Sequence, residues 1–93
     1  GEIEAKLSLH PDILETAVIA IIDDDGVRIH AHFSPRNGVK ISAIKLKVFS
    51  SEYLPVYMIP DTFSSHGDLP KTSTDKIDYQ SLNRLHEATA CPN

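Results

Sequence analysis

A single hairpin signal constrains the fold of this chain more than any other feature. The run "TAVIAII" (16–22) is short, continuous and rich in β-branched residues, which is typical of a buried strand. It is followed by "DDDG" (23–26), and Asp-Gly is a strong signal for a tight turn. The next run, "VRIHAHF" (27–33), alternates apolar and polar residues. The sequence therefore predicts an antiparallel β-hairpin over residues 16–33.

The second strand of this hairpin has two distinct faces. One face carries Val27, Ile29, Ala31 and Phe33, and the other carries Arg28, His30 and His32. Two histidines on one face could ligate a metal ion, but any polar strand face produces the same spacing, and no third ligand can be identified from the sequence. We therefore favour a solvated or partly packed face and predict no metal site.

Helical patterns and one further strand surround the hairpin. The start of the chain reads as a helix because Ile3 and Leu7 are i, i+4 neighbours before Pro11. A second helix is expected over Ser42–Leu54, with Ser42 as N-cap and one face formed by Leu46, Phe49 and Tyr53. A short strand is expected around Thr62–Ser65. The last helix, about Tyr79–Ala90, should pack through Leu82 and Leu85. The fold class is therefore α+β: a small, mostly antiparallel sheet packed with three helices.

Composition narrows the possible functions. A chain of 93 residues forms one compact domain, with a net charge of −4. Acidic and basic residues are interspersed without a basic tract, so we expect no nucleic-acid partner. No apolar run is long enough for a membrane span, so we expect no membrane partner. The single cysteine, Cys91, permits no internal disulfide and has no visible activating partner. A cytoplasmic location is the simplest expectation.

Two other groups of residues suggest sites that the sequence does not favour. Asp23, Asp24 and Asp25 could attract a cation, but they lack the spacing and the closing Glu of a calcium-binding loop, so we expect a plain turn. Ser64, Ser65, His66 and Asp68 supply the residue types of a hydrolase triad. Triad members meet in space rather than along the chain, and no G-x-S-x-G motif is present, so a structural loop is favoured.

The stretch "LPKTSTDKIDYQSL" (69–82) holds the most informative loop. It contains two lysines, Lys71 and Lys76, and a helical pattern follows it directly. Threonine and serine side chains can donate hydrogen bonds to oxyanions, a helix N-terminus favours an anion nearby, and lysine is a compact positive charge. The residues between the lysines, Thr72, Ser73, Thr74 and Asp75, are therefore candidates for a loop that contacts a phosphate or a carboxylate. These features alone do not define a function.

Four motifs in order resemble a known family, and together they cover nearly the whole chain. "GEIE" (1–4) resembles the end of the motif that follows the interdomain hinge in adenylate-forming enzymes. "HPDILETAVIAI" (10–21) resembles "HPxVxxAAVV", and "LPVYMIPDTF" (54–63) resembles "LPxYMVPxxF". "LPKTSTDKIDYQSL" resembles the terminal "LPxTxxGKxDRxxL". The chain is thus similar to the small C-terminal subdomain of adenylate-forming enzymes, most of all the amino-acid adenylation domains of nonribosomal peptide synthetases.

The resemblance implies a function and a catalytic residue. It implies that residues 1–93 are a single C-terminal lid subdomain, and that the large ATP- and substrate-binding domain lies outside these residues. By the family motif, Lys76 enters the active site during adenylation, within a substrate and ATP loop formed by residues 71–75. Gly1 and Glu2 would lie on the side of the subdomain that faces the hinge and the carrier protein. The chain alone is expected to be inactive.

The same resemblance implies cofactors and partners. ATP and Mg²⁺ would be bound mainly by the large domain, which would be the first partner. A phosphopantetheinyl carrier protein would be the second, because the activated acid is transferred to its thiol. The "TSTDK" stretch resembles the corresponding stretch in stand-alone adenylation enzymes that load proline onto carrier proteins. The alternatives are the C-terminal domain of an acyl-CoA synthetase and a non-catalytic module that docks a carrier protein.

The chain departs from the family pattern at two positions. Asp75 stands where the family usually has Gly, which adds a negative charge beside Lys76 and removes backbone freedom. Tyr79 stands where the family usually has Arg after the motif Asp. Both departures raise the question of how the loop keeps its geometry.

Overall fold

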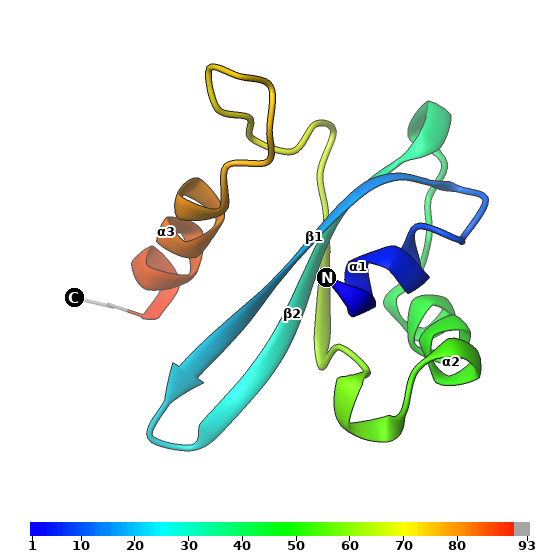
Figure 1. The fold of residues 1–93 in the computed structure, drawn as a ribbon, viewed down its shortest axis with the longest axis horizontal. Coiled ribbons are helices and arrows are strands. Elements are labelled where there is room, and N and C mark those ends of the chain that lie inside the picture. Colours follow the sequence, from blue (N-terminus) through cyan, green and yellow to red (C-terminus); the bar gives the residue numbers. More distant parts are fainter. Residues whose placement is uncertain (91–93) are drawn as a thin grey trace.

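The chain folds as a three-stranded sheet between two layers of helices (Figure 1). The computed structural model describes the backbone of residues 1–90 and the side chains of residues 1–86. The elements in chain order are α1 (Glu2–Leu7), β1 (Ile13–Asp23), β2 (Gly26–Pro35), η1 (Arg36–Gly38), α2 (Ala43–Tyr53), η2 (Val56–Met58), β3 (Thr62–Ser65) and α3 (Tyr79–Ala90). The predicted α+β class is confirmed, with three α-helices, a hairpin and a short strand among the described residues.

The sheet has the order β1-β2-β3, with the long second strand in the centre. Strands β1 and β2 pair antiparallel from Ile13↔Pro35 to Asp23↔Gly26, so the predicted hairpin is confirmed and is longer than the sequence pattern indicated. Strand β3 pairs with β2 in parallel, from His30↔Thr62 to Phe33↔Ser65. The parallel pairing is possible because α2 and η2 cross one face of the sheet between the two strands.

The predicted turn closes the hairpin with local hydrogen bonds. The backbone N–H of Asp25 donates to Oδ1 of Asp23 at 2.9 Å, and the Arg28 guanidinium contacts Oδ2 of Asp23 at 2.5 Å. Gly26 has a φ of 115°, which side-chain-bearing residues rarely adopt. The aspartates therefore stabilise a two-residue β-turn.

Each face of the sheet buries its own core. On the side of α1 and α2, the core consists of Leu7, Ile13, Ala31, Phe33 and Leu46. On the side of α3, it consists of Ala17, Ile19, Leu69 and Leu82. Because side chains alternate along a strand, neighbouring residues of β2 serve opposite cores, and residues 30–34 are buried on both faces. The sheet is therefore a buried middle layer at its centre and is exposed at the hairpin tip.

The helices confirm the predicted cap and two of the predicted buried leucines, but two other residues of the predicted packing faces are exposed. Ser42 caps α2 as predicted, its Oγ accepting from the N–H of Lys45 at 3.1 Å. Leu46 is fully buried, whereas Tyr53, predicted on the same face, is 45% exposed. In α3, Leu82 is buried as predicted, but Leu85 is 50% exposed. The expectation that α3 packs through Leu85 is wrong, because the residue one turn beyond Leu82 on the buried face is His86.

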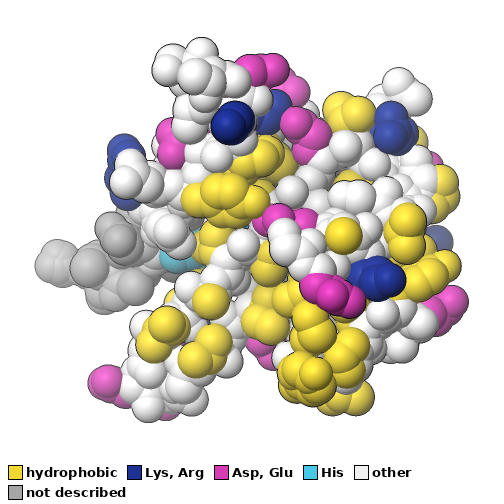
Figure 2. All heavy atoms as spheres, viewed as in Figure 1, with side chains coloured by type: hydrophobic (Ala, Val, Ile, Leu, Met, Phe, Trp, Pro, Cys, Tyr) yellow, Lys and Arg dark blue, Asp and Glu magenta, His cyan; other side chains and the backbone are white. Residues whose placement is uncertain are grey.

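Several large apolar side chains are exposed at the surface of the described residues. Val56 and Tyr57 of η2 are 87% and 80% exposed. Hydrophobic side chains gather at the lower edge of the face drawn in Figure 2. Within the described residues, no helix combines the length and the apolar character needed to cross a membrane.

Candidate functional site

The lysine-containing loop between β3 and α3 is closed by backbone hydrogen bonds. Lys71 and Ile77 form an antiparallel bridge. The N–H of Thr72 donates to the carbonyl of Lys76 at 2.7 Å, and the N–H of Asp78 donates to the carbonyl of Pro70 at 2.9 Å. Because its two ends are paired, the loop is a small hairpin with a defined shape rather than an open connection.

Hydrogen bonds inside the loop fix the backbone on either side of Lys76. The Oγ1 of Thr72 contacts the Oγ1 of Thr74 at 3.0 Å and accepts from the N–H of Lys76 at 3.3 Å. The N–H of Asp75 donates to the carbonyl of Thr72 at 2.9 Å, and Asp75 has a φ of 64°. This left-handed conformation explains why glycine suits the position, and aspartate is among the residues that tolerate it best. Ser73 is exposed in the same loop.

The structure separates the roles of the two lysines. The Nζ of Lys71 forms an ion pair with Oε2 of Glu15 on β1 at 2.8 Å. That hydrogen bond is the largest cause of a raised Lys71 pKa. Lys76 is exposed, and its ammonium takes part in no ion pair among the described side chains. Lys71 therefore ties the loop to the sheet, while Lys76 presents its charge to solvent.

The start of α3 is fixed by Asp78, a residue that the sequence analysis did not single out. The backbone N–H of Ser81 donates to Oδ1 of Asp78 at 3.2 Å, and the Ser81 hydroxyl donates to Oδ2 of Asp78 at 2.8 Å. These two bonds are the main cause of a lowered Asp78 pKa. An aspartate three residues before a serine at the start of a helix is a typical capping arrangement. Lys76 thus lies two residues before the capping residue Asp78 and three residues before the start of α3.

Tyr79, the second departure from the family pattern, has a definite partner. Its hydroxyl donates to Oε2 of Glu4 at 2.6 Å, and the same oxygen accepts from the N–H of Val18 at 2.8 Å. Burial and then this hydrogen bond raise the pKa of Tyr79 to about 12. Burial would raise the pKa of Glu4, but the bonds from Tyr79 and Val18 lower it on balance. Tyr79 therefore connects the start of α3 to α1 and β1.

The predicted hinge-side residues lie beside this connection. Gly1 and Glu2 are exposed and line an open pocket of about 310 Å³ together with Ile3, Glu4, Val18, Met58 and Tyr79. The amino group of Gly1 pairs with Oε1 of Glu4 at 2.9 Å. The start of the chain is thus held against the base of α3 through Glu4.

The residues of the disfavoured hydrolase triad take other partners. Oγ of Ser64 contacts Nε2 of His30 at 2.7 Å, and Nε2 of His66 contacts Nδ1 of His32 at 2.7 Å. No hydrogen bond joins Ser64, His66 and Asp68 among the described side chains. Cys91 lies outside the described residues.

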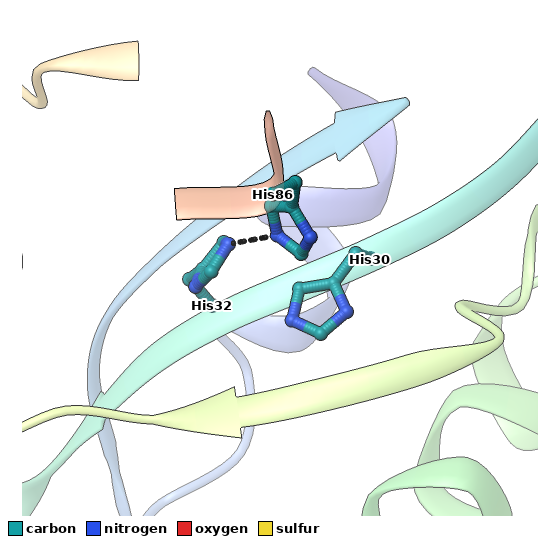
Figure 3. A group of neighbouring side chains, drawn as sticks. All are labelled: His30, His32 and His86. Atoms are coloured by element: carbon teal, nitrogen blue, oxygen red, sulfur yellow. Dashed lines mark hydrogen bonds between the residues drawn. The ribbon is translucent and has the colours of Figure 1, made fainter. Parts of the chain in front are cut away.

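The histidine face of β2 differs from its prediction. His30 and His32 are only 7% and 2% exposed, so the face that was expected to be solvated or partly packed is buried. Burial, reinforced by the neighbouring histidines, lowers the pKa of each to about 4. His86 of α3 covers them, with its Nε2 3.0 Å from Nε2 of His32 (Figure 3). The sequence signal for this third histidine was its i, i+4 spacing from Leu82 on the buried face of α3.

Comparison of the chain with known proteins identifies its family. The AMP-binding enzyme C-terminal domain family matches residues 2–76. Bacitracin synthase 3 of Bacillus licheniformis is 38% identical over 82 residues, which cover 88% of this chain and 1% of that protein. The chain therefore spans a very small part of that relative.

Solved structures share the fold. The acyl-CoA synthetase of Brucella canis aligns with a TM-score of 0.88 at 22% identity, over 97% of this chain and 17% of that one. An ATP-bound RpMatB-BxBclM chimera aligns with a TM-score of 0.84 at 25% identity, over 91% of this chain and 18% of that one. Together with the family match, these alignments show that the chain belongs to the AMP-binding enzyme C-terminal domain family of adenylate-forming enzymes.

Proposed function

We propose that the chain is the mobile C-terminal lid of an amino-acid-activating ligase and that Lys76 is its catalytic residue. The observation that carries the proposal is the contrast between the two loop lysines. Lys71 is bound to Glu15, whereas Lys76 is exposed and unpaired among the described residues. A catalytic cation must be free to meet its substrate and must also be held in a defined place, and the closed loop around Lys76 meets both needs.

The chemistry requires a positive charge where two anions react. In the first half-reaction, a carboxylate oxygen of the acid attacks the α-phosphorus of ATP, and the bond to pyrophosphate breaks. Negative charge accumulates on the reacting oxygens, and an ammonium group beside them stabilises that charge more in the transition state than in the ground state. Lys76 supplies this group, contacting the α-phosphate and the substrate carboxylate.

The loop around Lys76 supports this role through its internal bonds. Thr72 fixes the backbone N–H and carbonyl of Lys76, and the Lys71–Glu15 ion pair anchors the loop to β1. A longer or unpaired loop would let the ammonium spread over many positions, which lowers the fraction of productive geometry. Thr72, Ser73, Thr74 and Asp75 are therefore positioning residues, and the hydroxyl groups of the two threonines and of Ser73 can donate to phosphate oxygens.

ATP is proposed as the nucleotide because the family binds AMP and the structurally similar chimera contains ATP. Mg²⁺ prefers oxygen ligands and would accompany the phosphates. We propose that the large N-terminal domain supplies most of the protein ligands of this ion.

In the second half-reaction, a thiol attacks the adenylate and AMP leaves. We propose that the lid rotates between the two steps, withdrawing Lys76 and bringing another face, with Gly1 and Glu2 at the hinge side, toward a phosphopantetheinyl carrier protein. Similarity to bacitracin synthase 3 supports a carrier protein as the source of the attacking thiol. The activated acid is an amino acid, with proline as the first candidate.

Pyrophosphate exchange tests the proposal in the complete ligase that carries this domain. We expect amino-acid-dependent ATP–pyrophosphate exchange to fall about 100-fold or more in Lys76→Ala, since loss of one transition-state donor typically has this effect. Lys71→Ala is the matched control, because it removes an equal charge from the same loop; we expect a loss of less than about 10-fold. Undiminished exchange in Lys76→Ala would refute the catalytic role and favour a carrier-docking module.

The identity of the thiol is tested separately. Incubation of the complete ligase with amino acid, ATP and either free CoA or the carrier protein distinguishes the two acceptors. We expect a thioester on the carrier protein. Thioester formation only on CoA would instead identify the acyl-CoA synthetase alternative.

A further inference from the structure

Four histidines from three parts of the chain meet on the α3 side of the sheet. His30 and His32 come from β2, His66 follows β3, and His86 comes from α3. Imidazole centroids are 4.5 Å apart for His30–His32 and His30–His86, 5.1 Å for His32–His86, and 4.9 Å for His32–His66. Figure 3 shows His30, His32 and His86 turned toward one another between β2 and α3.

We propose that His30, His32 and His86 form a binding site for a divalent transition-metal ion of the Zn²⁺ class that fastens α3 to the sheet. One ligand nitrogen from each residue lies within 4.8 Å of the other two. In a tetrahedral site with metal–nitrogen bonds of about 2.0–2.1 Å, ligand nitrogens are about 3.3 Å apart. The Nε2 atoms of His32 and His86 are 3.0 Å apart, which is already close to that value.

The remaining distance can be closed by small rotations. The largest nitrogen separation, 4.8 Å, must shorten by about 1.5 Å, which rotation of imidazole rings about χ2 can achieve. Both nitrogens of His30 contact hydroxyl groups, Nδ1 with Thr62 and Nε2 with Ser64 at 2.7 Å. A hydroxyl can donate or accept, so either one can hold the second nitrogen while the other nitrogen binds the metal ion.

A second layer of contacts orients the proposed ligands. His32 would bind through Nε2, while its Nδ1–H donates to Nε2 of His66 at 2.7 Å. His30 would keep Thr62 or Ser64 on its non-ligating nitrogen. Such outer contacts fix the tautomer and the ring direction of metal-bound histidines. His66 is therefore an orienting residue in this arrangement.

The chemistry of the donors selects the metal class. Three imidazole nitrogens without a carboxylate suit Zn²⁺, Cu²⁺ or Ni²⁺ and not Mg²⁺ or Ca²⁺. A neutral imidazole nitrogen offers the lone pair that binds such an ion. The positive charge of Arg28 acts on His86, but the Arg28 guanidinium contacts Asp23 at 2.5 Å, which offsets that charge.

Zn²⁺ titration of the metal-free chain by isothermal calorimetry tests the site. We expect one Zn²⁺ per chain with a dissociation constant of about 10 µM or tighter, and binding about 100-fold weaker in His86→Ala. His86 lies at the edge of the cluster, so this variant should keep its far-ultraviolet circular dichroism. His30→Gln, which retains a polar group, provides a second variant should His86→Ala lose its fold.

Two matched controls separate the cluster from adventitious ligands. His10→Ala removes a histidine on the opposite face of the sheet, where its ring packs against Phe49, and Cys91→Ser removes the single thiol. We expect both to bind Zn²⁺ as the wild type does. Absence of binding at 100 µM Zn²⁺, or binding that survives both His86→Ala and His30→Gln, would overturn the proposal and leave a hydrogen-bonded histidine core.

Discussion

The histidine cluster predicts that the metal-free chain loses stability between pH 7 and pH 5. His30 and His32 have pKa values of about 4 in the folded chain, against 6.5 for an ordinary histidine. Well above pH 6.5, His30 and His32 are neutral in both the folded and the unfolded chain, so they add no pH dependence there. Between pH 6.5 and pH 4 the unfolded chain takes up protons that the folded chain excludes, so the free energy of unfolding falls as the pH falls.

The magnitude follows from the two pKa values. For a shift from 6.5 to about 4, lowering the pH from 7 to 5 removes about 2 kcal/mol per histidine, or about 4 kcal/mol for the pair. His86 changes in the same direction, because burial and Arg28 lower its pKa. A domain of this size is stable by roughly 5–14 kcal/mol, so the effect is a large fraction of the total.

Urea unfolding at pH 7 and pH 5 in the presence of EDTA measures the effect. With an m-value of about 1–2 kcal/mol/M, we expect the midpoint to fall by roughly 2–4 M in the wild type. His32→Gln removes one titrating group and should lose about half as much stability over the same pH change. Ile13→Val, in the opposite core, should be about 1 kcal/mol less stable at both pH values, with the wild-type pH dependence.

A loss of less than about 1 kcal/mol in the wild type between these pH values would mean that the histidines have nearly ordinary pKa values in the folded chain. Full pH dependence in His32→Gln would mean that the titrating groups lie elsewhere. Either result would refute the role assigned to the buried histidines.

Three further changes test the contacts that hold the loop and α3. Asp75→Gly should raise the free energy of unfolding by about 0.5–1 kcal/mol in urea melts, because it relieves a φ of 64°; destabilisation would contradict the assigned conformation. Tyr79→Phe should cost about 0.5–1.5 kcal/mol by removing the hydrogen bond to Glu4 while keeping the ring, and an unchanged melting curve would argue against that bond. Leu82→Ala should cost about 2–5 kcal/mol, because Leu82 is completely buried where α3 packs on the sheet; a loss below 1 kcal/mol, measured by urea unfolding, would place the helix elsewhere.

Local sequence patterns predicted the helices and strands well, but they did not predict how the third strand pairs or which faces of the sheet are covered. The Asp-Gly turn and the alternation of residues 27–33 specify a hairpin, and Ser42 specifies a helix start, because each signal acts over a few residues. The parallel pairing of β3 with β2 depends on the path of the chain through α2, which no local pattern reports. A buried strand over residues 16–22 was predicted, whereas the burial of residues 30–34 of β2 on both faces depends on α3 packing over them.

Residue types and the motif resemblance both point to the loop at residues 69–82, but its internal hydrogen bonds depend on how the chain folds back on itself. Lys71 and Lys76 are the same residue type in the same loop. The family motif singles out Lys76, and the ion pair of Lys71 with Glu15 on β1 adds a distinction that depends on the fold. The histidine cluster was missed for a similar reason. His30 and His32 were recognised as a pair, but His86 is 54 residues away from His32 and meets it only when α3 packs on the sheet.

The catalytic role of Lys76 is tested most directly by separating the two half-reactions in the complete ligase. In Lys76→Ala, we expect adenylate formation from amino acid and ATP to fall about 100-fold or more. Thioester formation from supplied aminoacyl-adenylate should stay within about threefold of the wild type, because the proposed rotation removes the lysine before that step. Lys71→Ala should preserve the ratio of the two rates. Equal loss of both half-reactions in Lys76→Ala, or loss of neither, would contradict the role assigned to this lysine.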